Sequence, residues 1–419
     1  MIALILDGAC APTLVGGLSL VERAVLAAQR AGVNRSVIAG SAHPHEATRA
    51  RLNARGADVT FVEWSALPHL DLSDGALVIR DGVLVEPRAL AALLDHSRAS
   101  DRTVLVAGGT ENDPALALVP PGAVRALGGV ASDGEFLTWL ASTQPQRRVS
   151  LGPLFCRRLR AASDVASAET DYIRRENGGK GESFFTKQIR RFSVPLSRVL
   201  VRHGATPTQV TLAGLVFAVG SAMAVSTGTY IASLVGALFY YTSMVLDCSD
   251  GEVARLSFRD SAFGAWLETI VDYVSYFLLL GGLVFGSQQR EHAGLYQNAA
   301  LVALAGSIVI TAVAGYLRHR VAGADPGQFD DASSAALEKA SPFHRFAAWA
   351  RQWIKRSTIA HLVVVLALVN QLPILILLWA FGAAVASVVI VGVEPFLVRR
   401  VKVMTLSHSP DLRLPQGGR

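Results

Sequence analysis

Four acidic residues, Asp247, Asp250, Glu268 and Asp272, have the types and spacing that chemistry would require. Side chains three or four residues apart share one face of a helix, so two antiparallel helices joined by a short turn bring both pairs together. Long uncharged segments flank them, and carboxylates at a membrane boundary are costly unless a cation compensates them. Oxygen ligands favour a hard ion, so the spacing predicts a site for Mg²⁺ or Mn²⁺, with one or two ions.

Small residues separate these acids. Gly251 and Ala254 leave the helix face of the first acidic pair open, and Gly264 does the same on the opposing helix. Arg255 adds a cation suited to phosphate or carboxylate. Paired metal ions beside an open carboxylate edge suit phosphoryl transfer, in which the charge of a diphosphate must be neutralised. The alternative is that the acids merely solvate a loop and a helix end.

Two long segments contain no Asp, Glu, Lys or Arg. One lies between Arg202 and Asp247, and the other lies between Arg356 and Glu394. Each exceeds the roughly 20 residues that one bilayer span requires, so each is predicted to hold two helices. Two further apolar stretches bring the prediction to six membrane helices. Their predicted ranges are 208–226, 230–249, 262–286, 295–317, 357–371 and 373–397.

Cations gather in one set of connections between these spans, including Arg255, Arg318 and Arg356, whereas the opposite set holds only Arg290. Cytoplasmic loops carry the excess of Lys and Arg, so both termini are predicted in the cytoplasm and the chain in the inner cell membrane. Because the cations border spans, a nucleic-acid partner is not expected. Residues 182–202 alternate apolar and basic positions at helical spacing and predict an amphipathic helix in the membrane interface, with a solvated linker helix as the alternative.

The composition agrees with a membrane protein that carries a separate soluble part. Of 419 residues, 51% are hydrophobic and only 17% are charged, against about a quarter charged in soluble proteins. Residues 1–165 instead alternate short apolar runs with helical patterns, which predicts an α/β domain with a mostly parallel sheet. Strands are expected at Ala3–Leu6, Ser36–Gly40, Val59–Trp64, Ala76–Ile79 and Thr103–Ala107, and helices at Leu18–Ala31 and Pro87–Ser97.

The predicted organisation is therefore an α/β domain followed by an all-α membrane bundle. Residues 1–165 form the cytosolic domain, 166–203 a linker with the interfacial helix, 204–402 the six-helix bundle and 403–419 a cytosolic tail.

The motif Asp247-x2-Asp250-Gly251-x2-Ala254-Arg255-x8-Gly264-x3-Glu268-x3-Asp272 resembles the signature of the CDP-alcohol phosphotransferase (CDP-alcohol phosphatidyltransferase) family. Thr206-Pro207-Thr208-x-Val210-Thr211 is similar to the family's entry to the first span, with Thr208 in place of Asn. Tyr316-x-Arg318-x-Arg320 is similar to a basic motif that closes the fourth span. The resemblance covers about residues 183–402. Its main departure is Glu268, where the family normally has Asp, and the extra methylene changes the metal spacing.

This resemblance implies a membrane enzyme of phospholipid or phosphodiester biosynthesis, with a CDP-alcohol donor, a lipid or polar hydroxyl acceptor, and a homodimeric assembly among membrane lipid. The four acids would hold two metal ions against the diphosphate, and Asp272 would also act as general base. The acceptor hydroxyl would attack the β-phosphorus and expel CMP. Nucleotide and diphosphate contacts would come from Thr208, Thr211, Gly251, Ala254, Arg255 and Gly264. Arg318 and Arg320 would bind an acceptor or donor phosphate, or would only set the topology.

Residues 1–165 resemble a cytidylyltransferase, as in the bifunctional inositol-phosphate cytidylyltransferase and di-inositol-phosphate phosphate synthase proteins. The expected Gly-rich loop is replaced by residues 7–12, and no lysine precedes Lys180. Asp81 matches a metal-binding Asp of that fold, whereas Ser163–Ala166 resembles a second metal motif that has lost its last acid. The domain is therefore predicted to be degenerate. Two alternatives for the whole chain are a synthase that uses CDP-inositol and a metal-binding membrane scaffold or carrier.

Overall fold

The computed structural model describes residues 1–387 apart from 9–12, 41–45, 71, 98–102, 111–112, 125–126, 128–129, 144–145, 162, 178–182, 289 and 322–355. The chain divides into two compact units. The first contains Met1–Asn177 with Val201–Gly204 and Leu256–Phe258, and the second contains Gly178–Leu200, Ala205–Arg255 and Arg259–Arg419.

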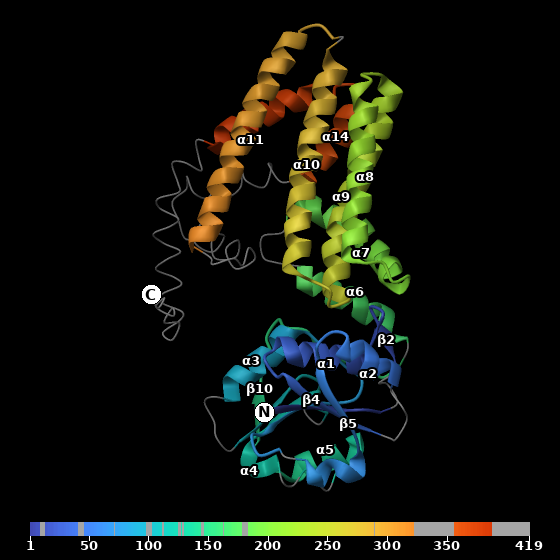
Figure 1. The fold of residues 1–419 in the computed structure, drawn as a ribbon, viewed down its shortest axis with the longest axis vertical. Helices are drawn as coiled ribbons and strands as arrows, with labels where there is room; N and C mark the ends of the chain where they lie inside the picture. The colour runs from blue at the N-terminus through green and yellow to red at the C-terminus, as the bar shows by residue number, and fades with distance from the viewer. Residues whose placement is uncertain are drawn as a thin grey trace. The chain divides into compact units, whose positions relative to one another are not determined.

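A seven-stranded sheet forms the centre of the first unit (Figure 1). Its strand order is β10-β8-β9-β6-β1-β4-β5, and only β9 is antiparallel to its neighbours. The strands are β1 (Ile2–Leu6), β4 (Arg35–Gly40), β5 (Asp58–Glu63), β6 (Ala76–Ile79), β8 (Val104–Ala107), β9 (Leu116–Val119) and β10 (Gln146–Val149). Short antiparallel pairs join β2 (Leu14–Val15) to β3 (Leu18–Ser19) and β7 (Val83–Val85) to β11 (Cys156–Arg158). The predicted α/β domain with a mostly parallel sheet is confirmed.

Helices cover both faces of this sheet, as Figure 1 shows. Ala3 and Ile5 of β1 pack with α1 (Leu20–Arg30) and α3 (Pro87–Ser97), whereas Leu4 and Leu6 pack with Phe136 of α5 (Asp133–Ser142). Alternate residues of a strand point to opposite faces, so the continuous apolar run of β1 is what a doubly covered strand requires. The remaining helical segments are α2 (Glu46–Asn53), η1 (Trp64–His69), α4 (Pro121–Val124) and α6 (Asp164–Asn177).

The second unit is helical. It contains α7 (Phe184–Arg202), α8 (Pro207–Ser226), α9 (Tyr230–Leu256), α10 (Ala262–Ser287), α11 (Ala293–Val321), α14 (Arg356–Leu368) and a helix at Ile374–Ser387. Four helices are long and apolar enough to cross a membrane: α8, α9, α10 and the Ala293–Val313 part of α11. Helices α14 and Ile374–Ser387 are apolar but shorter. The count of six spans therefore stays a prediction, and residues 388–397 of the sixth lie outside the described residues.

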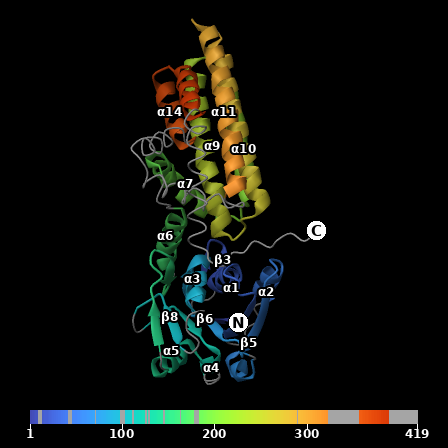
Figure 2. The same cartoon turned by 90° about the vertical axis from the view of Figure 1, so that its left-hand side faces the viewer.

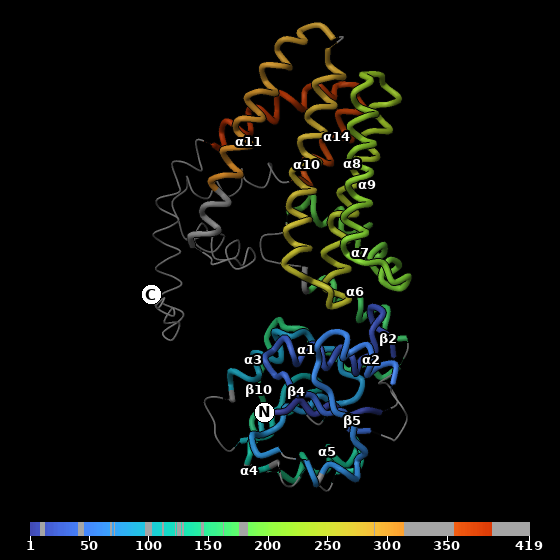
Figure 3. The backbone as a smooth tube through the Cα atoms, viewed as in Figure 1, coloured from blue at the N-terminus to red at the C-terminus, as the bar shows by residue number. Residues whose placement is uncertain are grey.

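The chain reverses direction between α8, α9 and α10, as the trace in Figure 3 shows. Helix α10 packs closely against α8. A side chain at Gly282 of α10 would lie 2.6 Å from the backbone oxygen of Ala222 in α8, so glycine is required there. Helix α9 continues seven residues beyond the predicted end at 249, to Leu256. The acidic motif therefore lies entirely on helices α9 and α10 and on the turn between them.

Candidate active site

The start of α8 fixes the first predicted substrate residues. Thr206 caps the helix and accepts a hydrogen bond from the backbone N–H of Gln209, whose side chain accepts one from the Thr206 N–H. Pro207 follows at the first helical position, where its missing N–H costs nothing. One turn later Thr211 is buried, whereas Thr208 is exposed. The Thr-Pro motif is thus a helix start that directs Thr211 into the bundle.

Asp250 is the most buried of the four acids, with 2% of its surface exposed. The Thr211 hydroxyl of α8 donates to Asp250 Oδ2 at 2.6 Å, and the backbone N–H of Gly251 donates to Oδ1 at 2.6 Å. Both donors stabilise the carboxylate form and hold its orientation. Thr211, predicted to contact the substrate, therefore positions an acid in this structure.

Asp247 of α9 and Asp272 of α10 are joined by Arg356, the first residue of α14. Arg356 Nη1 donates to Asp247 Oδ1 at 2.6 Å and also to Asp272 Oδ1. Helices α9, α10 and α14 lie side by side in Figure 1 and Figure 2. The structure thus brings one acid of each pair, Asp247 and Asp272, to a shared guanidinium that the sequence analysis treated only as a topology-setting cation. In the sequence, the feature that could have indicated a role for Arg356 is its position as the last charged residue before an uncharged segment.

Glu268 lies one turn before Asp272 on α10 and interacts electrostatically with Asp247, Arg255 and Arg356. Within the described part of the chain, no three carboxylate, imidazole or thiol groups are close enough together to hold one metal ion. The four acids supply only oxygen ligands, which a hard divalent cation prefers. The predicted Mg²⁺ or Mn²⁺ site at Asp247, Asp250, Glu268 and Asp272 therefore stays a prediction.

Polar side chains lie close to the two glycines of the motif, Gly251 and Gly264. A side chain at Gly251 would lie 3.2 Å from both terminal nitrogens of Arg255, so the Arg255 guanidinium lies over the bare backbone of that turn. Ala254 and Gly264 are both half-buried. Arg255 is thus placed on the same helix as the first acidic pair, over Gly251.

Arg318 and Arg320 fall in the last turns of α11. Their side chains lie outside the described residues, so their predicted phosphate contact stays a prediction.

Glu252 is a second important residue that the sequence analysis missed. It follows the Asp250–Gly251 pair on α9, and its side chain is fully buried against α7. Arg190 pairs with it at 3.0 Å, and the hydroxyls of Ser193 and Ser197 donate to it at 2.9 and 2.7 Å. Helix α7 is therefore fixed to the acidic helix by a fully hydrogen-bonded carboxylate. The signal was the spacing of Ser193 and Ser197, one turn apart among the apolar and basic residues of the second half of α7.

The first unit places its own acids at the carboxyl ends of the parallel strands, where α/β folds bind ligands. A side chain at Gly8, after β1, would lie 2.6 Å from Asp81 Oδ2, and one at Gly40, at the end of β4, would lie 2.7 Å from the Asp7 side chain. The side chains of Asp81 and Asp7 therefore pack directly against the backbone at Gly8 and Gly40. Of residues 7–12, which take the place of the expected Gly-rich loop, 9–12 lie outside the described residues.

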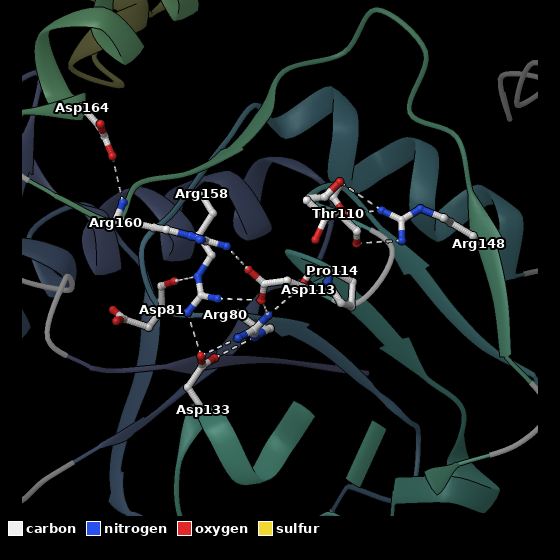
Figure 4. A network of polar contacts seen from close by, with 12 residues as sticks. Arg80, Asp81, Thr110, Asp113, Pro114, Asp133, Arg148, Arg158, Arg160 and Asp164 are labelled. Atoms are coloured by element: carbon white, nitrogen blue, oxygen red, sulfur yellow. Dashed lines mark hydrogen bonds and ion pairs between the residues drawn. The ribbon is translucent and has the colours of Figure 1, made fainter. Parts of the chain in front are cut away.

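Next to these acids a network of arginines and aspartates fills the strand ends (Figure 4). Arg80, which is 2% exposed, donates to Asp113 and binds both carboxylate oxygens of Asp133, at 2.8 and 2.6 Å. Arg158 bridges the same two acids, and Arg160 contacts Asp113 at 2.8 Å. Three guanidinium groups are thus already paired with carboxylates at this edge of the sheet.

The network gives the first unit a defined pH dependence. Burial raises the pKa of Asp113, but hydrogen bonds from Arg80 and Arg160 and the Arg158 charge outweigh burial, so the pKa is lowered overall. A lowered pKa contributes stability that is present above the unfolded value, near 4, and is lost as the pH falls through the folded value. We expect the stability advantage of the wild type over Asp113→Asn to shrink from pH 6 to pH 3 in thermal unfolding of the full chain. A pH-independent difference would contradict this assignment.

Comparison with known proteins gives partial matches. No family model matches the chain. A bifunctional IPC transferase and DIPP synthase from Aquifex aeolicus (strain VF5) is 28% identical over 149 residues, 35% of this chain and 33% of that protein. An archaetidylinositol phosphate synthase from Methanothermobacter thermautotrophicus (strain Delta H) is 31% identical over 102 residues, 24% of this chain and 49% of that protein. The chain is therefore similar to proteins that are named as transferases and synthases.

Among solved structures, the inositol-1-phosphate CTP transferase from T. maritima aligns with a TM-score of 0.32 and 13% identity, covering 42% of this chain and 96% of that one. The chain spans about a third of the length of the bifunctional relatives that it matches. The named relatives confirm the resemblance to transferases and synthases that the sequence motifs predicted.

Proposed function

We propose that this protein is an integral membrane transferase that moves a substituted phosphate from a CDP-alcohol to an acceptor hydroxyl and releases CMP. The observation that supports this most is the convergence of Asp247 and Asp272, from different helices, on one cationic group. Asp250, held by Thr211, lies on the same helix as Asp247. A cation position between carboxylates at a membrane boundary is what a diphosphate donor requires.

Two Mg²⁺ or Mn²⁺ ions, when bound by the four acids, would neutralise the diphosphate and make the acceptor hydroxyl more acidic. The residues of this chain then divide the remaining work. Asp272 takes the proton of the acceptor hydroxyl on a carboxylate oxygen, and the acceptor oxygen forms a bond to the β-phosphorus. The bond from that phosphorus to the CMP oxygen breaks, and CMP leaves with the electron pair. Arg255 donates to the diphosphate across Gly251.

The remaining predicted contacts belong to the same proposal. Thr208 lies exposed at the start of α8, and Ala254 and Gly264, which are half-buried, would face the nucleotide. Arg318 and Arg320, at the end of α11, would bind a phosphate on the acceptor or donor. The bundle would lie in the inner membrane with both termini in the cytoplasm, as residues 204–402 of a homodimer, with 166–203 as linker and interfacial helix and 403–419 as tail.

An inositol-type synthase that uses CDP-inositol is a second candidate. It is favoured by the names of the relatives, a DIPP synthase and an archaetidylinositol phosphate synthase. The N-terminal domain, 1–165, would then be a degenerate cytidylyltransferase, because Arg80, Arg158 and Arg160 are engaged by acids and no lysine precedes Lys180. It would serve as a scaffold, dimer contact or regulatory module.

Purified full-length protein in detergent, given Mg²⁺, candidate acceptors and either CDP-diacylglycerol or CDP-inositol, tests these proposals by CMP release. Release with one donor identifies the substrate class. CTP with inositol phosphate should not replace the CDP-alcohol, because the N-terminal domain is proposed to be inactive. Divalent-metal binding without any CMP release would instead support the scaffold or carrier.

Glu268 provides a finer test, because it stands where the resembling family has Asp. We expect Glu268→Gln to lower CMP release roughly a hundredfold, because a metal-binding carboxylate is lost. Glu268→Asp keeps the carboxylate and should remain within about tenfold of the wild type, with a shifted preference between Mg²⁺ and Mn²⁺. Steady-state CMP release at varied metal concentration measures both. Equal activity of Glu268→Gln and the wild type would remove Glu268 from the site.

A further inference from the structure

Helix α9 ends in a backbone conformation that its sequence does not favour. The backbone N–H of Arg259 donates to the carbonyl of Ala254 at 2.8 Å, a hydrogen bond typical of helices that end with a left-handed residue. That position is usually glycine, because a side chain there is strained. Here it is Phe258, with a φ of 53°. A bulky residue in this conformation costs free energy, so other contacts must hold Phe258 in place.

Those contacts lie within the first unit, to which Leu256–Phe258 belongs. Phe258 is 8% exposed and lies in the same apolar cluster as Ile5 of β1. The guanidinium groups of Arg23 and Arg30, both on α1, lie 4.9 and 4.7 Å from the centroid of its ring. A cation over an aromatic face is favourable, and more so where water is excluded. The ring is therefore part of the core of the α/β fold.

Arginines of the first unit also cap the end of α9. Arg23 is 1% exposed, and its Nη1 donates to the carbonyl of Leu256, the last residue of α9. Arg55 Nη1 donates to the carbonyl of Ser257 at 2.9 Å. The last carbonyls of a helix have no partners within the helix and form its negative end, so two guanidinium groups stabilise this end. A side chain at Gly16, between β2 and β3, would lie 2.5 Å from Leu256 Cγ, so that turn packs closely against Leu256.

The captured segment is the covalent link between the two acidic pairs, because α9 carries the first pair and α10 carries the second. We propose that the first unit is a clamp on this link, and that Phe258 is a positioning residue through which the clamp fixes the end of α9 and the start of α10. The consequence for catalysis rests on the proposed transferase function. Such a clamp keeps the acids in one arrangement for the reaction, and it requires no nucleotidyl transfer by residues 1–165.

The test replaces Phe258 with glycine in the full-length protein in detergent and measures hydrogen exchange. Glycine adopts the left-handed conformation without strain, so local helix capping alone predicts that Phe258→Gly slows exchange at the end of α9 or leaves it unchanged. The clamp predicts the opposite. Exchange in the last turn of α9 and the first turn of α10 should become about fivefold faster or more, because the ring that anchors them is gone.

Phe136→Ala is the matched control, since it removes a buried ring from the apolar cluster on the other face of the same sheet. It should change exchange at the end of α9 by less than about twofold. Arg55→Met removes one cap without emptying the core, and it decides the question if Phe258→Gly does not fold. It should make exchange at the end of α9 about threefold faster. Arg49→Met, which removes a guanidinium stacked on Phe61, should leave that exchange unchanged.

CMP release tests the positioning role. Phe258→Gly should lower kcat about tenfold and change KM by less than about twofold, because the acids are displaced but still present. Phe136→Ala should keep the kcat of the wild type at a temperature at which it is folded.

Slower or unchanged exchange in Phe258→Gly, equal effects of Phe258→Gly and Phe136→Ala, or equal effects of Arg55→Met and Arg49→Met would each overturn the clamp. Faster exchange with an unchanged kcat would overturn the positioning role of Phe258. A wild type that releases no CMP from any CDP-alcohol would instead overturn the proposed transferase, and the exchange measurements would still decide whether the first unit holds this link.

Discussion

Asp272→Asn is expected to lower metal-dependent CMP release roughly a thousandfold without unfolding the protein. A general base contributes about a hundredfold to ten-thousandfold to such a rate, and this change also weakens a proposed metal ligand. The amide keeps the shape of the carboxylate and can still accept a hydrogen bond from Arg356, so the contact between α10 and α14 survives. The fold should therefore persist while turnover is lost.

The control for this experiment is Asp260→Asn. Asp260 is an exposed acid in the turn between α9 and α10, and it is outside the proposed site. Its variant should release CMP at a rate close to that of the wild type, with an unchanged thermal unfolding midpoint for both variants. Near-normal CMP production by Asp272→Asn would reject the base assignment.

Glu252→Ala is expected to destabilise the second unit by about 2–4 kcal/mol, because it leaves a half-buried guanidinium and two buried hydroxyls without their shared acceptor. The side chain of Glu252 is fully buried, and that of its partner Arg190 is 21% exposed. The hydroxyls of Ser193 and Ser197 also lose their bonds to it. Thermal unfolding in detergent measures the loss, and hydrogen exchange in α7 locates it.

Arg191→Met is the matched control, because Arg191 is an exposed cation next to Arg190 on the same helix. It should change stability by less than about 0.5 kcal/mol. The double variant Glu252→Ala with Arg190→Met should lose less than the sum of the single changes, since the two residues share one interaction. Additive losses would mean that Glu252 stabilises the unit through other contacts.

Runs and spacings of apolar and charged residues predicted those features of the structure that depend on residues near one another in the sequence. The strands β1, β4, β5, β6 and β8 were expected from apolar runs, and Asp247 and Asp272 were expected to approach each other from neighbouring helices. Strand β9 was missed because its four apolar residues pair antiparallel with β6 and β8, which depends on chain topology rather than on local pattern. Its flanking residues Pro114 and Pro120 were the available signal.

Two residues of the candidate site could not be predicted from motif spacing. Arg356 is 109 residues from Asp247 along the chain, so their contact exists only because α14 packs beside α9 and α10. Glu252 lies within the acidic motif, but its role depends on which helix face α7 covers. Both contacts join side chains of different helices. The sequence indicates that such a buried charge needs a partner, but it does not indicate which residue that partner is.

The close approach of Gly282 to Ala222 has a mechanical consequence. Because the backbones of α10 and α8 touch there, the two helices are pinned at a point more than two helical turns from Asp272. Any widening at the acidic end of these two helices is therefore expected as a rotation about this close approach, in which small angular changes produce the largest separation beside Asp272.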